Sequence, residues 1–261
     1  MDLGIAGRKA LVCGASSGLG LACARALVGE GVHVVLVARG DERLAQAQAR
    51  LQALAGAAVV ERIAADVSTE AGRARIVAAH PVLDILVTNA GGPPPGDFRQ
   101  WTLENWHAAL DANMLAPIAL IRAYLDGMIE RRWGRIVNLT SSAVKSPVEA
   151  LGLSNGARAG LTGFVAGLAR SPSAAAGVTI NNLLPGTFDT PRLAGNFKAQ
   201  AERQGRAVDE VITARLAKHP ARRFGQPDEL GALCAFLCSE RAGYLNGQNL
   251  LLDGGSFAGV M

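Results

Sequence analysis

Short runs of β-branched and aliphatic residues alternate along this chain with Ala- and Leu-rich stretches of helical period. Continuous apolar strands separated by helices are typical of a parallel sheet covered on both faces. Because crossovers between parallel strands are right-handed, the pattern predicts an α/β fold with a Rossmann-type, doubly wound, seven-stranded parallel sheet in one domain, residues 1–261. The predicted strands are Lys9–Cys13, Val32–Ala38, Ala58–Ile63, Ile85–Thr88, Gly134–Leu139, Thr179–Leu184 and Asn249–Leu252. The predicted helices are 18–29, 41–54, 69–79, 102–131, 153–170 and 227–239.

The segment 187–220 is the longest stretch in which no strand is predicted. Gly195, Asn196 and Gly205 interrupt its helical pattern. A long excursion of this kind is either a lid over the strand ends or a surface loop, and we favour the lid. No motif in this segment indicates which substrate the protein binds.

Composition excludes several classes of protein. The net charge of +4 is mild and the charges are interspersed, so a nucleic-acid partner is not expected. The densest basic patch, 131–135, is interpreted as a solvated helix end. No signal peptide or uncharged apolar run near the ~20 residues of a membrane span is evident, which favours a cytoplasmic protein. The four cysteines lack the spacing of a metal site and are expected to be buried.

A glycine-rich turn follows the first predicted strand and opens the first predicted helix. Glycines at such a turn allow a tight bend and close approach of phosphate oxygens to the backbone, while the helix N-terminus offers free N–H groups. This placement predicts a dinucleotide-binding site. The residues concerned are Gly14, Ser16, Ser17, Gly18, Leu19 and Gly20.

Arg39 stands at the end of the second predicted strand, where an NAD site has an acidic residue for the ribose 2′-hydroxyl. A guanidinium pairs with a 2′-phosphate, whereas a carboxylate would repel it. We therefore predict NADP(H) rather than NAD(H). The alternative is that Arg39 is only a solvated residue at the start of the next helix.

Further motifs follow in order, and together they resemble the short-chain dehydrogenase/reductase family, with closest similarity to its 3-oxoacyl-[acyl-carrier-protein] reductase-like members. The resemblance covers essentially the whole chain and implies an adenine contact, a central-sheet motif, an active-site asparagine, a catalytic serine and a nicotinamide-side loop. By this resemblance the adenine contact falls on Asp66 and Val67, and the central-sheet motif on Asn89, Ala90 and Gly91. The active-site asparagine is Asn113, and the catalytic serine is Ser141. The nicotinamide-side loop contains Pro185, Gly186, Phe188 and Thr190. For Phe188, a backbone contact to the nicotinamide and a plain packing role are left equally open. Cys13 and Thr88 replace the family's usual Thr and Asn, which is expected to weaken a hydrogen-bonding contact.

The same resemblance implies a catalytic tyrosine about thirteen residues after the serine and a lysine four residues later. This register lands on Ser154 and Arg158. The only two tyrosines, Tyr124 and Tyr244, have no lysine four residues on, so a shifted alignment does not restore the pair. A serine hydroxyl is a much weaker acid than a phenol, and a guanidinium stays protonated, although it can still hold the nicotinamide ribose.

The proton donor is therefore open. Lys145, in the loop after Ser141, is the best substitute, because a partly desolvated lysine can act as an acid. The alternative is a plain loop lysine. Asp189 and His219 on the predicted lid are weaker candidates.

The sequence thus predicts an NADP(H)-dependent oxidoreductase with an atypical proton-delivery site. By resemblance its substrate is a small-molecule carbonyl or secondary alcohol, such as a 3-oxoacyl thioester. A dinucleotide-binding sensor or regulatory protein without turnover is the alternative, and a purely structural subunit is less favoured. By the same resemblance we expect a homodimer or homotetramer assembled through helices 102–131 and 153–170.

Overall fold

All seven predicted strands form in the computed structural model, which describes residues 1–260. They make one parallel sheet in the order β3-β2-β1-β4-β5-β6-β7. The order reverses between β1 and β4, which is where open α/β sheets bind ligands. The strands are β1 (Lys9–Cys13), β2 (His33–Ala38), β3 (Val60–Ala64), β4 (Ile85–Thr88), β5 (Gly134–Leu139), β6 (Val178–Pro185) and β7 (Asn249–Leu252).

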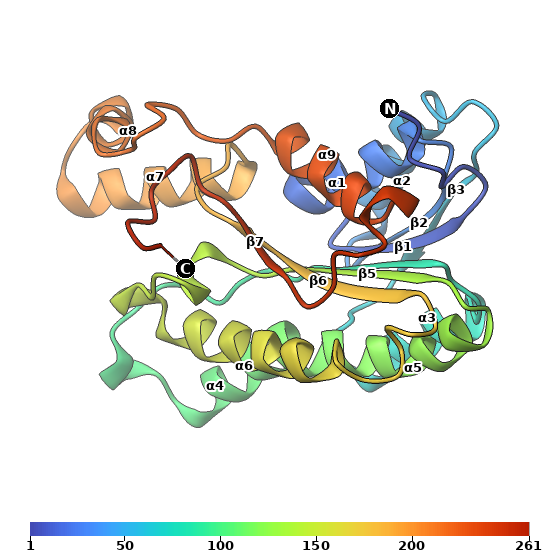
Figure 1. Cartoon of the computed structure of the whole chain (residues 1–261). Helices are drawn as coiled ribbons and strands as arrows, with labels where there is room; N and C mark the ends of the chain where they lie inside the picture. Colours follow the sequence, from blue (N-terminus) through green and yellow to red (C-terminus); the bar gives the residue numbers. More distant parts are fainter. Residues whose placement is uncertain (261) are drawn as a thin grey trace.

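Helices cover both faces of the sheet, as Figure 1 shows, which confirms the doubly wound fold. Helices α1, α2 and α9 pack on one core, and α3, α5 and α6 pack on the other. Successive strand residues point to opposite cores, Val12 to the first and Leu11 to the second, as a pleated strand requires. The helices are α1 (Gly18–Gly29), α2 (Asp41–Gln52), α3 (Glu70–Ala79), α4 (Leu103–Leu110), α5 (Ala116–Glu130), α6 (Gly152–Leu168), α7 (Pro191–Gln204), α8 (Val208–Ala217) and α9 (Pro227–Leu237). Short helical turns are η1 (Phe98–Gln100), η2 (Asp111–Leu115), η3 (Ser142–Val144), η4 (Glu149–Leu151) and η5 (Glu240–Ala242).

The predicted helix 102–131 is continuous in space but contains a π-helical turn, η2, between α4 and α5. By length and mean hydropathy, Leu103–Glu130 is the one helical segment of the described chain able to cross a membrane, which the sequence pattern did not indicate. In this fold Leu120, Ile121 and Met128 of α5 pack into the core beneath the sheet. The apolar character of the segment thus serves the interior of the protein.

A row of polar side chains crosses four strands, from the last residue of β4 to the first residue of β7. Thr88 donates a hydrogen bond to Asn138 (2.6 Å), Asn138 donates to Asn182 (3.1 Å), and Asn182 donates to Asn249 (2.8 Å). These residues are also register partners from β4 to β7. The expectation that Thr88 weakens a hydrogen-bonding contact is therefore wrong, because its hydroxyl starts a chain that ties the strands together.

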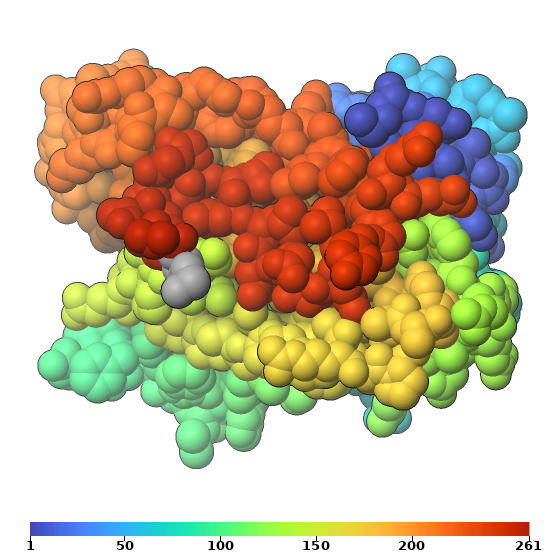
Figure 2. Space-filling view, in the orientation of Figure 1, coloured from blue at the N-terminus to red at the C-terminus, as the bar shows by residue number. Residues whose placement is uncertain are grey.

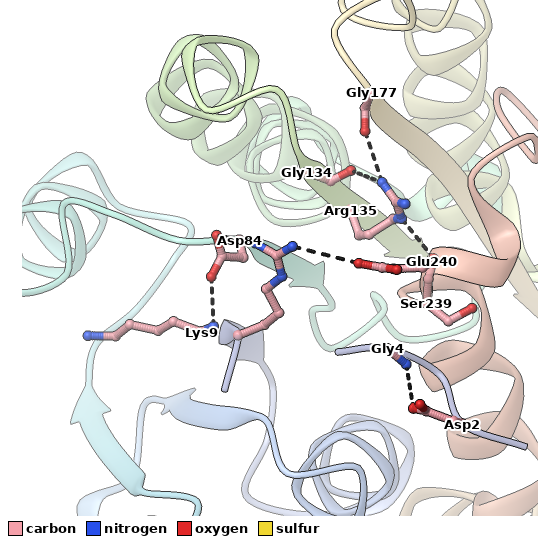
Figure 3. Close-up of polar contacts among 10 residues, drawn as sticks. Asp2, Gly4, Lys9, Asp84, Gly134, Arg135, Gly177, Ser239 and Glu240 are labelled. Carbon is pink, nitrogen blue, oxygen red and sulfur yellow. Dashed lines mark hydrogen bonds and ion pairs between the residues drawn. The ribbon is translucent and has the colours of Figure 1, made fainter. Parts of the chain in front are cut away.

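Arg131 and Arg132 are exposed at the end of α5, as the interpretation of a solvated helix end requires, but Arg135 at the opposite end of the sheet does not fit it. Its side chain is buried in β5 and donates to the carbonyls of Gly134, Gly177 and Ser239 at 2.9 to 3.0 Å (Figure 3). Its guanidinium also lies over the ring of Trp133, 4.6 Å from the centroid. Burial lowers the pKa of Arg135. The carbonyls replace the water that this charge loses, so Arg135 joins the starts of β5 and β6 to the end of α9.

The segment after β6 contains two helices, α7 and α8, with a small core of their own built on Phe197, Ala201 and Val211. Helix α7 runs unbroken through Gly195 and Asn196, contrary to the predicted interruption, and ends where Gly205 adopts a positive φ of 60°. In Figure 2 this segment, in orange, stands above the yellow-green and teal loops that follow β5 and β4.

Candidate active site

The turn from β1 into α1 has the geometry that the glycine pattern predicts. Gly14 and Gly18 have positive φ angles of 61° and 58°, which L-residues rarely adopt. A Cβ on Gly20 would collide with the backbone carbonyl of Gly14. No side chain caps the helix, and no acidic residue lies in its first turn. The N–H groups around Ser16, Ser17 and Leu19 therefore face a position suited to an anion.

Two distant segments meet this turn. Asn89, directly after β4, packs so closely that a Cβ on Gly14 would lie 2.5 Å from its amide nitrogen. Thr190, at the start of α7, lies against Gly18, at 3.7 Å from the position of a Cβ there. The structure thus brings together three segments that the sequence motifs assign to one cofactor.

Arg39 and Asp66 follow the ends of the neighbouring strands β2 and β3. Arg39 is exposed, and Asp66 accepts hydrogen bonds from the backbone and the hydroxyl of Ser68 (2.9 and 2.7 Å). These hydrogen bonds, and more weakly the charge of Arg39, lower the pKa of Asp66. Val67 follows and accepts a hydrogen bond from Arg73 (2.8 Å) through its carbonyl. Asp66 is thus a fixed acceptor, and Arg39 is an exposed cation beside it.

Asn113 lies inside the π-helical turn η2, which explains how a helical side chain reaches the edge of the sheet. Its amide nitrogen donates to the carbonyls of Gly91 (3.4 Å) and Ala109 (3.3 Å). Its side-chain oxygen is buried and finds no hydrogen-bond partner among residues 1–260. Single π turns occur often at functional sites, and an unpartnered buried acceptor is free for a donor from a ligand or water.

Ser141, Ser154 and Arg158 are brought together where β5 meets α6. The Arg158 guanidinium donates to the carbonyls of Leu139 (2.9 Å) and Thr140 (2.5 Å), directly before Ser141. Ser141 caps η3, with its hydroxyl accepting from the N–H of Ala143 (3.1 Å). Ser154 lies one turn before Arg158 on α6, and each is only 7% exposed. The serine hydroxyls and the guanidinium therefore border the same end of the sheet.

Burial lowers the pKa of Arg158 from 12.5 to about 10, with a smaller contribution from the positive charge of Arg192. The guanidinium remains protonated near neutral pH, so it supplies a fixed positive charge and does not shuttle protons. Its Nε is buried without a hydrogen-bond partner in the part of the chain that the structure describes. One donor of Arg158 is thus left for a ligand.

The loop after β6 is held against the C-terminal segment. The N–H of Gly186 donates to Leu252 (2.7 Å), and a Cβ on Gly186 would lie 2.7 Å from Asp253. Pro185, the last residue of β6, leads into this contact, and Thr190 then caps α7 by accepting from Leu193 (3.3 Å). This geometry fixes the start of the lid over the glycine turn.

Phe188 has the packing role that the sequence left open beside a nicotinamide contact. Its ring is buried in the core and packs on Gly225. Its neighbours pair with Gly225, since Asp189 donates to the Gly225 carbonyl (2.8 Å) and Gly225 donates to Thr187 (3.0 Å). Because the neighbours of Phe188 bond to Gly225, the N–H and C=O of Phe188 itself point away from Gly225.

The three candidate proton donors lie in different surroundings. Lys145 follows η3 and is half-buried, with its ammonium 5.8 Å from the ring centroid of Phe257. Asp189 is exposed. His219 is buried, with Nε2 3.1 Å from the hydroxyl of Ser256, and it lines a cavity of about 150 Å³ behind Phe188. Ser141, Ser154 and Arg158 do not line that cavity, whereas Lys145 ends the same short turn, η3, that Ser141 begins.

Two tryptophans that the sequence motifs did not single out shape the start of α6. The Trp101 ring fills the space beside Gly152, and Trp106 lies 3.1 Å from the position of a Cβ on Gly156. The two rings form an edge-to-face pair with centroids 6.1 Å apart. The signal was the pair of glycines four residues apart, Gly152 just before the predicted helix 153–170 and Gly156 within it, because such glycines mark close packing.

The two tyrosines lie in opposite surroundings, and Tyr244 is fully exposed before β7. Tyr124 is buried in the core under α5, where burial raises its pKa. Cys13 is also buried, and burial raises the pKa of its thiol to about 12. The other cysteines are buried too, and residues 1–260 hold no cluster of three or more potential metal ligands.

The residues present fit a dinucleotide by shape and charge. Cβ atoms would fill the turn at Gly14 and Gly20, the Nε of Arg158 lacks a partner, and Arg39 stands free beside Asp66. These features lie along the carboxyl edge of the sheet, at the reversal of strand order.

Comparisons with known proteins agree with this geometry. Residues 14–256 match the sequence model of the family described as enoyl-(acyl carrier protein) reductase. The chain is 34% identical to D-beta-hydroxybutyrate dehydrogenase of Cupriavidus necator, over 95% of this chain and 97% of that protein. It is 33% identical to 3-oxoacyl-[acyl-carrier-protein] reductase of Vibrio cholerae, over 98% and 99%. Among solved structures, the L-sorbose reductase of Gluconobacter frateurii in complex with NADPH and L-sorbose superposes with a TM-score of 0.94, at 31% identity and full coverage of both chains.

Proposed function

The chain belongs to the short-chain dehydrogenase/reductase family, and on this premise we propose that it is an NADP(H)-dependent oxidoreductase with an atypical proton-delivery site. Its substrate is a small-molecule carbonyl compound or the corresponding secondary alcohol, with a 3-oxoacyl thioester as one candidate. The observation that carries the proposal is the meeting of the glycine turn, Asn113, Ser141, Arg158 and Thr190 at one edge of the sheet.

NADP(H) as the cofactor is supported by the exposed Arg39 and by relatives solved with NADPH. When bound, the nicotinamide supplies or accepts the hydride. The turn of Gly14, Gly18 and Gly20 would hold the pyrophosphate, and Asp66 and Val67 would face the adenine. Asn89, Ala90 and Gly91 would border the adenosine, and Pro185, Gly186, Phe188 and Thr190 the nicotinamide.

The catalytic roles follow from chemistry at the same edge. Ser141 and Ser154 offer hydroxyl donors to a carbonyl oxygen, and Arg158 supplies a fixed positive charge for the alkoxide that develops there. Asn113 holds the loop at Gly91 and keeps a free amide oxygen for a water molecule. We propose that Ser154 and Arg158 occupy the places of the family's tyrosine and lysine. General acid–base help is worth about 10²–10⁴ in rate, so a slow enzyme is expected unless another group delivers the proton.

Replacement of Arg39 by alanine tests the cofactor. We expect the Kd for NADPH to rise about tenfold to a hundredfold, because a charge-assisted contact to the 2′-phosphate is lost. The Kd for NADH is expected to change less than about twofold. Fluorescence titration with both nucleotides measures the two constants, and Arg43→Ala on exposed α2 is the matched control. Equal affinity of the unmodified protein for NADPH and NADH would contradict the assignment.

Replacement of Lys145 by alanine tests the proton source. If Lys145 delivers the proton, kcat for ketone reduction should fall about 10²-fold or more, with the Kd for NADPH unchanged. Lys218→Ala, in the lid segment, is the matched control. The measurement is the decay of NADPH absorbance, and unchanged turnover removes Lys145 from the mechanism.

The oxidoreductase proposal as a whole is tested with NADPH and a panel of ketones, hydroxy compounds and a 3-oxoacyl thioester. Turnover of any member supports it. Tight NADPH binding without turnover of any member would favour the second candidate, a nucleotide-binding sensor or regulatory protein. That candidate has one observation in its favour, the short hydroxyl of Ser154 where a phenol is usual.

We further propose that the protein is a cytoplasmic homodimer or homotetramer. Exposed Leu103 and Leu115, at the two ends of the α4–η2 segment, support pairing through these helices. On α6, a Cβ added to Gly163 or Gly167 would meet no atom within 4 Å, which leaves room for a neighbouring helix.

A further inference from the structure

Two arginines of the candidate site, Arg158 and Arg192, have no carboxylate partner among the residues that the structure describes. Arg158 is buried with a free Nε, and Arg192 lies in the first turn of α7. Arg192 reaches from the lid to the loop after β4, where Nη2 donates to the carbonyls of Gly92 (3.0 Å) and Pro93 (3.4 Å). Neither guanidinium forms an ion pair within residues 1–260.

Each guanidinium contacts a backbone carbonyl next to a residue of the candidate site. Gly92, which Arg192 contacts, follows Gly91, whose carbonyl accepts from Asn113 (3.4 Å). Thr140, which Arg158 contacts, directly precedes Ser141. Arg192 therefore approaches from the lid and Arg158 from α6.

The two charges also act on each other, since the charge of Arg192 contributes to the lowered pKa of Arg158. Arg158 is buried and Arg192 is exposed, so the repulsion between their charges is only partly screened by water, and it is relieved when an anion binds beside both. A carboxylate matches the planar guanidinium donors of both residues.

We infer that Arg192 and Arg158 bind a carboxylate of the substrate, so that the substrate is an oxo acid or hydroxy acid. The inference rests on the proposed function and narrows its substrate class. In the reducing direction, oxo acid, NADPH and a proton give hydroxy acid and NADP⁺. The hydride adds to the carbonyl carbon, the proton adds to its oxygen, and the carboxylate is unchanged.

A second anion competes for Arg192. Thr190 lies against Gly18, so the cofactor pyrophosphate is also within the neighbourhood of the first turn of α7. If Arg192 binds the pyrophosphate, replacing it should weaken NADPH binding. If it binds the substrate, replacing it should reduce the preference for acids over neutral ketones. These two readouts separate the sources.

The test compares 2-oxo and 3-oxo acids with their methyl esters, which keep the ketone and lack the charge. For the unmodified protein we expect kcat/KM to be at least about tenfold higher for the best acid than for its ester. In Arg192→Leu this ratio should fall about tenfold or more, and Arg192→Lys should retain part of it. The Kd for NADPH should change less than about twofold in both variants. Arg203→Leu, in the last turn of the same helix, is the matched control and should leave the ratio unchanged.

Two results would overturn the inference. One is a preference for the esters across the panel in the unmodified protein. The other is a loss of NADPH affinity in Arg192→Leu with an unchanged acid-to-ester ratio, which assigns Arg192 to the pyrophosphate. If no compound turns over, the proposed catalytic function fails, and calorimetry with the same acids and esters on the NADP⁺ complex still decides the anion site. Binding of acids but not esters, lost in Arg192→Leu, supports it, and no selective binding of acids rejects it.

Discussion

The double variant Ser154→Tyr, Arg158→Lys is expected to reduce ketones about 10²–10⁴-fold faster than the unmodified protein. A phenol with a pKa near 10 is a far stronger acid than a serine hydroxyl, and a neighbouring ammonium lowers its pKa toward the working pH. The lysine ammonium can also donate to the Leu139 and Thr140 carbonyls that now accept from Arg158. The measurement is kcat for NADPH oxidation across the ketone panel.

The pH profile of the double variant gives a second readout. Its ketone reduction should fall as the pH rises through the phenol pKa, because the deprotonated phenol has no proton to give. Each single variant serves as a control, and the gain should require the tyrosine. Turnover unchanged in a folded double variant that still binds NADPH would show that Ser154 and Arg158 do not occupy the proposed places.

Gly20→Ala is expected to weaken NADPH binding by at least about a hundredfold. The added Cβ would collide with the carbonyl of Gly14, which is backbone and cannot rotate away, so the turn between β1 and α1 must move. The N–H groups of that turn would then lose their common direction, and phosphate recognition depends on it. Fluorescence titration with NADPH measures the loss.

Gly29→Ala is the matched control, because it lies in the same helix with nothing within 4 Å of the added carbon. It should bind NADPH as the unmodified protein does. Circular dichroism establishes that Gly20→Ala keeps its helices. Normal NADPH affinity in a folded Gly20→Ala protein is the result that contradicts the proposed cofactor turn.

The strands and the glycine turn could be predicted from sequence because each is specified locally. Apolar runs such as Leu11–Cys13 are buried on both faces of a parallel sheet, so their length alone marks them as strands. Gly14, Gly18 and Gly20 lie in a tight turn that requires glycine, so the turn can be predicted from the spacing of the glycines.

What could not be predicted depends on contacts between distant segments. The π turn that brings Asn113 to Gly91 lies just before Pro117, which has no N–H to donate to the Asn113 carbonyl, but a proline does not by itself specify a π turn. Arg135 belongs to a run of basic residues, and only the fold supplies carbonyls from Gly177 and Ser239 to bury its charge. The position of the Arg192 side chain depends on its hydrogen bond to Gly92, a hundred residues earlier in the chain.

The separate core of the lid has a consequence for how substrate preference changes. Phe197, Ala201 and Val211 pack on one another, and Phe197 stacks on Phe224 with ring centroids 5.5 Å apart, outside the two cores that cover the sheet. Substitutions among these residues alter the shape of α7 and α8 while the cofactor cradle keeps its own packing. The sheet with the cofactor turn can keep its packing while α7 and α8 change. New substrate preferences can therefore be acquired by substitutions in α7 and α8 beyond Thr190, which itself lies against Gly18 of the nucleotide site.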